Sequence, residues 1–160
     1  MVVAAQKSGF SREFFLKTVA LTKVGEYAFD SERKLMSAIY KPTTATVLPL
    51  GYSYILCKGA PEAVLGRCTH YMGANDDDMS SHSFTNSLMK TEQNPLTEQY
   101  VDFVSAQAEK MANAGLRVLG FAIRRVNDEE GIGIIKAKKD TESEKSLSFV
   151  GLIGLIDPPK

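Results

Sequence analysis

The sequence has few of the residues that build metal centres, disulfide frameworks or membrane spans. It contains two cysteines and two histidines among 160 residues, and its longest apolar run, residues 149–156, is far below the roughly 20 residues that cross a bilayer. Nineteen lysines and arginines balance 19 aspartates and glutamates, which excludes a strong field for nucleic acid or an acidic membrane surface. With no evident outer apolar stripe, we expect a monomer that neither enters a membrane nor binds nucleic acid.

Metal and disulfide chemistry have little support. Cys57 and Cys68 have only His70 and His82 near them in the sequence, which is too few ligands for a zinc site. A disulfide between the two cysteines is an alternative, but we expect a reduced pair, as is usual in a cytosolic protein. Three consecutive aspartates, residues 76–78, lie in a polar stretch where such a run is more often solvated than metal-binding. We therefore predict no metal site.

No segment carries the residues of a self-sufficient enzyme. Neither histidine has a serine or cysteine beside it in a recognisable catalytic frame. The phosphate-binding loop that ends in Gly-Lys-Ser/Thr is absent, and Gly131 and Gly133 lack the third glycine of a dinucleotide fingerprint and open no clear helix. We predict no catalytic residue; the alternative, an independent phosphohydrolase, would be revealed by phosphate release.

What is present is enough apolar material, 44% of the residues, for the core of one domain. β-branched, aromatic and apolar runs bounded by turn residues predict strands, and residues 19–29 and 35–40 should be antiparallel neighbours. The predicted strands cover residues 19–29, 35–40, 52–58, 116–126 and 147–156. The fourth reads as a central strand covered on both faces, because its apolar run is unbroken.

Helices should connect and flank these strands. Residues 2–7 and a segment after the cap Ser11 read as helices, Pro61 should open a short one to Leu65, and residues 96–114 form the clearest helix before Gly115. Residues 73–95 and 127–145 read as polar or charged connections without regular structure. The expected fold class is α+β, a mostly antiparallel twisted sheet flanked by helices.

Two segments could hold a ligand. In Lys58-Gly59-Ala60-Pro61-Glu62, a lysine at a strand end precedes a glycine and the N–H groups that open a helix, a combination suited to an anion. In residues 29–37, Phe29 and Lys34 flank a turn and could stack on and pair with a flat, charged ligand. If each segment is considered alone, the alternatives are that Lys58 is an ordinary lysine at a surface turn and that Phe29 is an ordinary core residue.

Together these segments carry a family resemblance. "FDSERKLMS" and "KGAPE" occur in the order and at distances compatible with the nucleotide-binding domain of type II P-type cation-transporting ATPases, and "GLRVLGFA" and "GLIGLIDPPK" resemble two later segments of that domain. The resemblance covers nearly the whole chain. It implies a nucleotide-binding domain over residues 1–156 and a hinge over residues 157–160, including Asp157 and Pro158, toward a phosphorylation domain.

The resemblance also implies a binding site and partners. Phe29 would stack on adenine, Lys34 and Met36 would line the pocket, Lys58 would lie deep in it, and Arg117 would reach the phosphates. Gly59 and Ala60 would allow close approach, and Ser31 completes the implied nucleotide-binding set without the cation that some calcium pumps have there. The implied ligand is ATP, with Mg²⁺ accompanying it in the parent protein, and the implied partners are the phosphorylation and actuator domains.

Segments of the family that are absent from this sequence indicate which activity to expect. The "DKTGT" segment that holds the family's phosphorylated aspartate is absent, as are the membrane helices. We expect an isolated domain that binds ATP without hydrolysing it, on the cytoplasmic side of the membrane that holds the parent transporter of calcium, sodium or another cation. The alternative is an interaction module of the same fold that has lost the nucleotide and uses residues 73–95 as its contact surface.

Overall fold

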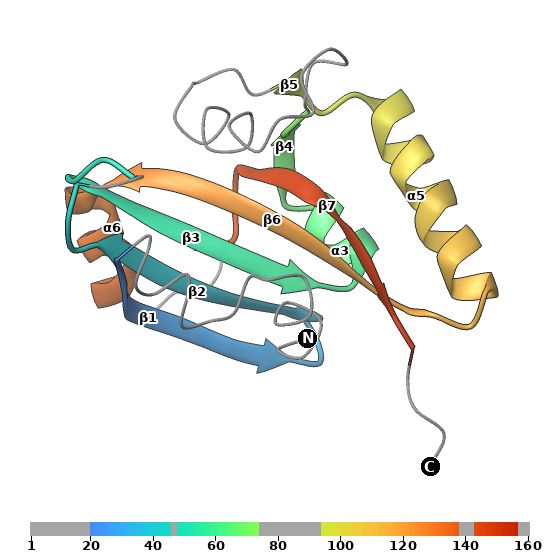
Figure 1. Cartoon of the computed structure of the whole chain (residues 1–160), viewed down its shortest axis with the longest axis horizontal. Helices are drawn as coiled ribbons and strands as arrows, with labels where there is room; N and C mark the ends of the chain where they lie inside the picture. The colour runs from blue at the N-terminus through green and yellow to red at the C-terminus, as the bar shows by residue number, and fades with distance from the viewer. Residues whose placement is uncertain (1–19, 46–47, 74–93, 138–142, 157–160) are drawn as a thin grey trace.

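The computed structural model describes residues 20–45, 48–73, 94–137 and 143–156. Its centre is a seven-stranded sheet in the order β1-β2-β3-β6-β7-β4-β5, with α6 near one end and α3 and α5 near the other (Figure 1). The predicted helices over residues 2–7 and after Ser11, the acidic run 76–78 and the hinge residues Asp157 and Pro158 lie outside the described residues.

The sheet is mostly antiparallel. Its strands are β1 (Leu21–Asp30), β2 (Leu35–Pro42), β3 (Tyr52–Gly59), β4 (Cys68–Tyr71), β5 (Asn94–Pro95), β6 (Arg117–Asn127) and β7 (Leu147–Leu155). β4 runs parallel to β7, and all the other neighbouring pairs are antiparallel. The α+β class is confirmed, and so are the five predicted strands and the pairing of the first two.

Two of the three described helices are those predicted. In α3 (Pro61–Leu65), proline occupies the first turn, where its missing N–H costs nothing. In α5 (Glu98–Asn113), the Thr97 side chain caps the helix by accepting a hydrogen bond from the Tyr100 backbone N–H at 3.2 Å. Gly115 follows with φ +80°, the left-handed conformation expected after a helix.

The third helix corrects the sequence prediction. Residues 127–145 were expected to be irregular, and Gly131 and Gly133 to open no helix, but α6 spans Asp128–Ala137. Its start is stabilised by the Asn127 side chain, which accepts from the Glu130 N–H at 2.8 Å, and by acidic residues in the first turn. The helix persists despite its glycines because Ile134 packs into the core with Ile39 and Ile55.

Two further expectations need correction. β4 was not predicted, and the short β5 pairs with it at the end of the stretch that reads as loop. β6 is central, between β3 and β7, but it is not covered evenly, since Leu119 and Phe121 are half-buried whereas Ala122 is buried. An unbroken apolar run cannot distinguish a strand buried on both faces from one whose second face lines a pocket.

The helices cover one face of the sheet. Leu35 and Cys57 pack with Val64 of α3 and Val104 of α5, whereas Ile39 and Ile55 pack with Ile134 of α6. Because successive side chains of a strand alternate between faces, Met36, Ala38 and Tyr40 of β2 point to the opposite face. That second face is where a ligand could be held.

The cysteines form no disulfide with one another. Cys57 is buried and Cys68 half-buried, and both are free thiols. Burial raises the pKa of each thiol to about 12, because a thiolate would lose hydration in these surroundings. Within the described residues, no helix is long and apolar enough to cross a membrane.

The two glycines of α6 should respond oppositely to alanine. A Cβ on Gly131 would lie 2.5 Å from the Ser53 Oγ, whereas a Cβ on Gly133 would meet no atom within 4 Å. We expect Gly133→Ala to stabilise the fold by about 0.5–1 kcal/mol, because alanine reduces the entropy of the unfolded chain, and Gly131→Ala to destabilise it by roughly 1–3 kcal/mol. Urea unfolding of both variants checks this, and equal effects would contradict the packing of α6 on β3.

Candidate functional site

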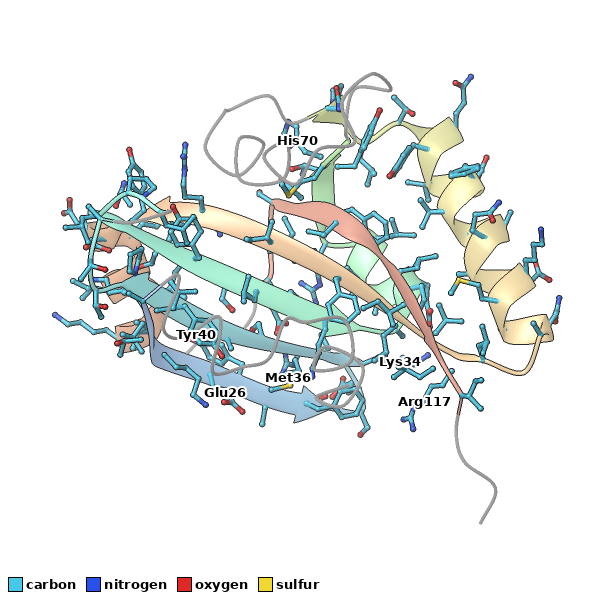
Figure 2. All side chains as sticks on the ribbon, in the orientation of Figure 1. Glu26, Lys34, Met36, Tyr40, His70 and Arg117 are labelled. Carbon is cyan, nitrogen blue, oxygen red and sulfur yellow. The ribbon has the colours of Figure 1, made fainter. Side chains whose placement is uncertain are left out.

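An open pocket of about 560 Å³ lies at one end of the sheet. Its lining residues come from β1, the β1–β2 turn, β2, the β3–α3 junction, β6 and β7: Phe29, Lys34, Met36, Lys58, Gly59, Ala60, Arg117, Val118, Leu119 and Leu155. Figure 2 shows Lys34 and Arg117 close together at this end, with Met36 and Tyr40 further along the sheet. Residues that lie up to 126 positions apart in the sequence, Phe29 and Leu155, therefore contribute to one concave surface.

Strand pairing brings the two candidate segments together. In the antiparallel register of β2 and β3, Leu35 lies opposite Gly59 and Met36 opposite Lys58. Met36 and Lys58 thus occupy one cross-strand pair on the same face of the sheet, and both line the pocket. The two residues lie 22 positions apart in the sequence and are direct neighbours in the sheet.

A β-bulge aims Phe29 at the pocket. Tyr27 pairs with Ser37 and Asp30 with Leu35, so two residues of β1, Ala28 and Phe29, oppose the single residue Met36 of β2. Strict alternation would place Phe29 on the same face as Tyr27, which packs on the α6 side. The extra residue changes that direction, and the Phe29 side chain lines the pocket with 61% of its surface exposed.

The turn after Phe29 is stabilised by its own backbone. The Asp30 Oδ1 accepts from the N–H groups of Glu32 at 2.8 Å and Arg33 at 3.0 Å, and these bonds hold the pKa of the Asp30 carboxyl below its usual value. The Lys34 N–H donates to the Asp30 carbonyl at 2.7 Å. Lys34 itself adopts a left-handed conformation, φ +55°, which directs it away from the regular path of the turn.

Gly59 is required by the backbone of that turn. A Cβ at this position would lie 2.2 Å from the carbonyl oxygen of Lys34, which is closer than any real contact. The Lys34 carbonyl also accepts from the Ala60 N–H at 3.1 Å. The Ala60 N–H is therefore engaged, and Pro61 has none, so neither residue can donate to an anion at this helix start.

Three cations surround the pocket. Lys34 is exposed and its Nζ lies 3.4 Å from the Glu62 Oε1, Lys58 is half-buried, and Arg117 is exposed at the entry to β6. The Lys34–Glu62 pair is solvated on both sides, with 58% and 68% of the side chains exposed, so it holds Lys34 only weakly. An anionic ligand could compete with Glu62 for this lysine.

Seven of the eight sequence-predicted residues meet in this pocket, and one does not. Ser31 lies exposed in the turn and is not among the lining residues. Three lining residues were missed: Val118, Leu119 and Leu155. The sequence indicates only core positions for the two missed leucines. The signal that could have found Leu155 is its pairing with the candidate residue Arg117 across β6 and β7.

A smaller hollow of about 260 Å³ adjoins the pocket and shares Met36 and Lys58 with it. Ala38, Tyr40, Leu56, Cys57 and Phe121 complete its lining, so its walls are mainly apolar. The floor of the site is thus a mainly apolar face of the sheet that includes Lys58, with Lys34 and Arg117 at its rim. Such a surface suits a ligand with a flat apolar part and a charged part.

Comparison with known proteins identifies the family of the chain. The family model described as P-type ATPase, cytoplasmic domain N, matches residues 2–160. The chain belongs to this N-domain family. The recognition made from "FDSERKLMS" and "KGAPE" is therefore confirmed.

The relatives of this N domain are ion transporters by name. The sodium/potassium exporting P-type ATPase cta3 of Schizosaccharomyces pombe is 31% identical over 158 residues, 99% of this chain and 12% of that protein. The calcium-transporting ATPase of Bacillus subtilis is 30% identical over 162 residues, 100% of this chain and 15% of that protein. The endoplasmic reticulum calcium ATPase srcA of Aspergillus fumigatus is 28% identical over 144 residues, 88% of this chain and 12% of that protein. The N domain thus spans a small part of each relative.

The donor set of the described residues fits a nucleotide better than a metal ion. Within the described ranges, no three histidine, cysteine, aspartate or glutamate side chains gather as metal ligands. An exposed phenyl ring and three cations do fit an adenine ring and its phosphates.

Gly59→Ala should damage both fold and site. The new Cβ would press on the Lys34 carbonyl, so we expect roughly 2–3 kcal/mol of destabilisation, measured by urea unfolding. Gly66→Ala is the matched control, because its φ is −63° and its Cβ would make an ordinary contact of 3.4 Å with the Glu62 carbonyl. If Gly59→Ala were as stable as Gly66→Ala, the close approach of β3 to the turn would be wrong.

Proposed function

We propose that this N domain binds the adenosine end of ATP in the pocket between the β1–β2 turn and the β3–α3 junction. The observation that carries the proposal is the convergence of an exposed phenyl ring, three cations and an apolar floor in one open pocket. Adenine has two apolar faces and a polar edge, and the phosphates add negative charge, so each part of the nucleotide has a matching surface.

Each of the eight candidate residues then has a role. Phe29 stacks on adenine, Met36 forms apolar wall, and Lys58 meets the base from the floor of the pocket. Lys34 and Arg117 face the phosphates from the rim, where Arg117 has the more rigid set of donors. Gly59 and Ala60 keep the backbone close to the base, and Ser31 contributes from the turn only if the nucleotide extends beyond the described pocket.

The parent protein, in this proposal, is an ATP-driven P-type cation transporter in a membrane. This domain, residues 1–156, would hold ATP on the cytoplasmic side and deliver its terminal phosphoryl group to an aspartate of the phosphorylation domain through a hinge at residues 157–160. When bound, Mg²⁺ would neutralise charge on the phosphates. The actuator domain is the other partner. Calcium and sodium/potassium transporters are about equally similar to this chain, so we propose cation transport without naming the ion.

The isolated chain should bind without hydrolysing. Most of the described contact is with the adenosine end, and the phosphates meet only the exposed Lys34 and Arg117, so the affinity for ATP should be weak, on the order of high micromolar to millimolar. ADP and AMP should bind nearly as well, because most of the contact is with the base.

Titration with ATP tests this function. We expect the native chain to bind ATP weakly and saturably, as measured by NMR or calorimetry, and to release no phosphate. Binding should be lost in Phe29→Ala, which removes the stacking ring, and in Lys58→Ala, which removes the half-buried cation of the pocket. Tyr52→Ala, which removes a side chain at the other end of β3, is a control that should keep binding. A folded native chain that fails to bind at high ATP would overturn the function and favour an interaction module, and phosphate release would favour a hydrolase.

Removing the Glu62 carboxylate, which competes with the phosphates for Lys34, should strengthen the binding of ATP. Glu62→Gln replaces the carboxylate that pairs with Lys34 Nζ, so we expect ATP to bind about two- to threefold more tightly, with a smaller gain for AMP. The gain should shrink at about 0.5 M salt, where such charges are screened. Glu129→Gln, at an exposed position of α6, is the control for a change of net charge alone. Equal gains in both variants would show that Glu62 has no local effect.

A further inference from the structure

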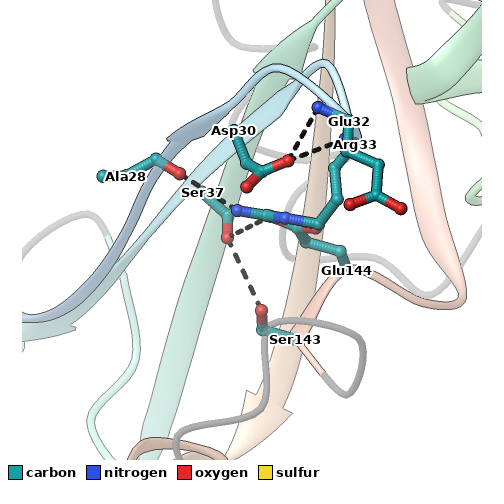
Figure 3. Close-up of polar contacts among 7 residues, drawn as sticks. All are labelled: Ala28, Asp30, Glu32, Arg33, Ser37, Ser143 and Glu144. Carbon is teal, nitrogen blue, oxygen red and sulfur yellow. Dashed lines mark hydrogen bonds and ion pairs between the residues drawn. The ribbon is translucent and has the colours of Figure 1, made fainter.

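A charged pair lies buried behind the binding turn. Glu144 is fully buried, and its Oε2 accepts from the Arg33 Nη1, whose side chain is 15% exposed (Figure 3). Glu144 precedes β7 and lies 111 positions from Arg33 in the chain. Burying a carboxylate is unfavourable unless charge and hydrogen bonds compensate it, so the position of this pair needs a reason.

The guanidinium of Arg33 holds the β-bulge. Its Nη2 donates to the Ala28 carbonyl at 3.0 Å, and Ala28 is the first of the two bulge residues that oppose Met36. The backbone N–H of the same arginine donates to the Asp30 Oδ1 at 3.0 Å. Arg33 therefore contacts the chain on both sides of Phe29, the residue that the bulge directs into the pocket.

The carboxylate of Glu144 anchors this arginine to β2. Its Oε1 accepts from the Ser37 Oγ at 2.9 Å, and Ser37 pairs with Tyr27 immediately before the bulge. The Ser143 Oγ lies 3.5 Å from the same serine hydroxyl. The segment before β7 thus ties β2 to the guanidinium, and the guanidinium ties β1 into the same unit.

The directionality of hydrogen bonds explains why a charged pair, and not an apolar one, occupies this position. An apolar side chain of similar volume would fill the space and often stabilise a fold as well, but it would not fix the direction of the Ala28 carbonyl. Arginine has a planar fork of donors that can bind a carboxylate and a carbonyl at once. The network stabilises one orientation of the bulge, and with it the direction of Phe29.

We propose that Arg33 and Glu144 are positioning residues of the nucleotide site, which act through the bulge to orient Phe29 for stacking on the base. This inference rests on the proposed function. Neither residue lines the pocket, so neither needs to touch the nucleotide. Because the effect is on the base and not on the phosphates, it should weaken AMP and ATP to the same extent.

The test compares two arginines of equal burial. Arg33→Lys keeps the charge but loses the fork, and Arg124→Lys is the matched control, since Arg124 is also 15% exposed and pairs with Glu130 on α6, away from the pocket. Titration with ATP and AMP at a temperature where each variant is folded measures affinity, and urea unfolding measures stability. We expect Arg33→Lys and Glu144→Gln to weaken both nucleotides about threefold to tenfold, and Arg124→Lys to leave affinity unchanged.

A spectroscopic readout separates positioning from stability. A base stacked on Phe29 should shift the ring proton resonances of that residue on nucleotide binding, and this shift should shrink at saturation in Arg33→Lys but not in Arg124→Lys. If Glu144→Gln does not fold, Ser37→Ala removes one bond of the network and should give a smaller loss of the same kind. Native binding with unchanged affinity and ring shift in folded Arg33→Lys would overturn this inference alone, whereas absence of native binding would overturn the proposed function.

Discussion

The pairing of β2 with β3 is the constraint on which the site depends. It sets Leu35 opposite Gly59 and Met36 opposite Lys58, and so brings the aromatic segment and the lysine segment side by side. The pairing at this end is possible only because residue 59 has no side chain, since the Lys34 carbonyl occupies the place of its Cβ. The same carbonyl accepts from the Ala60 N–H, so the turn and the start of α3 are joined in one hydrogen-bonded unit.

The rest of the site follows from two departures from regular structure beside this pairing. The bulge at Ala28 and Phe29 rotates an aromatic ring out of the helix-covered face, and the left-handed Lys34 ends the turn so that β2 can begin at Leu35. Both cost backbone free energy, and both are held by polar contacts: the Asp30 carboxylate inside the turn and the Arg33–Glu144 pair behind it. A rigid sheet with local irregularities at its end is a common way to present a binding surface.

Much of the fold was predictable because its long elements have strong local signals. The five predicted strands have β-branched, aromatic or continuous apolar runs, the helix α5 has a helical apolar pattern with a clear cap, and Gly115 has the conformation expected of it. α6 was missed because its two glycines and charged first turn conceal a helix that depends on packing of Ile134. β4 was missed because four residues, Cys68–Tyr71, are too few for a pattern and form a strand by pairing with the distant β7 and with β5.

The sequence by itself determined the family, the fold class and the chemical types of residue available for a ligand, because local motifs and periodicity are properties of neighbouring positions. Only the tertiary structure decided which of those residues meet. Seven of the eight candidates share a pocket and Ser31 does not, Leu119 and Leu155 prove to be walls of that pocket, and Glu144 proves to lie behind its turn. Strand register, a bulge and a buried ion pair bring together positions that are far apart in the chain, and no local pattern encodes such contacts.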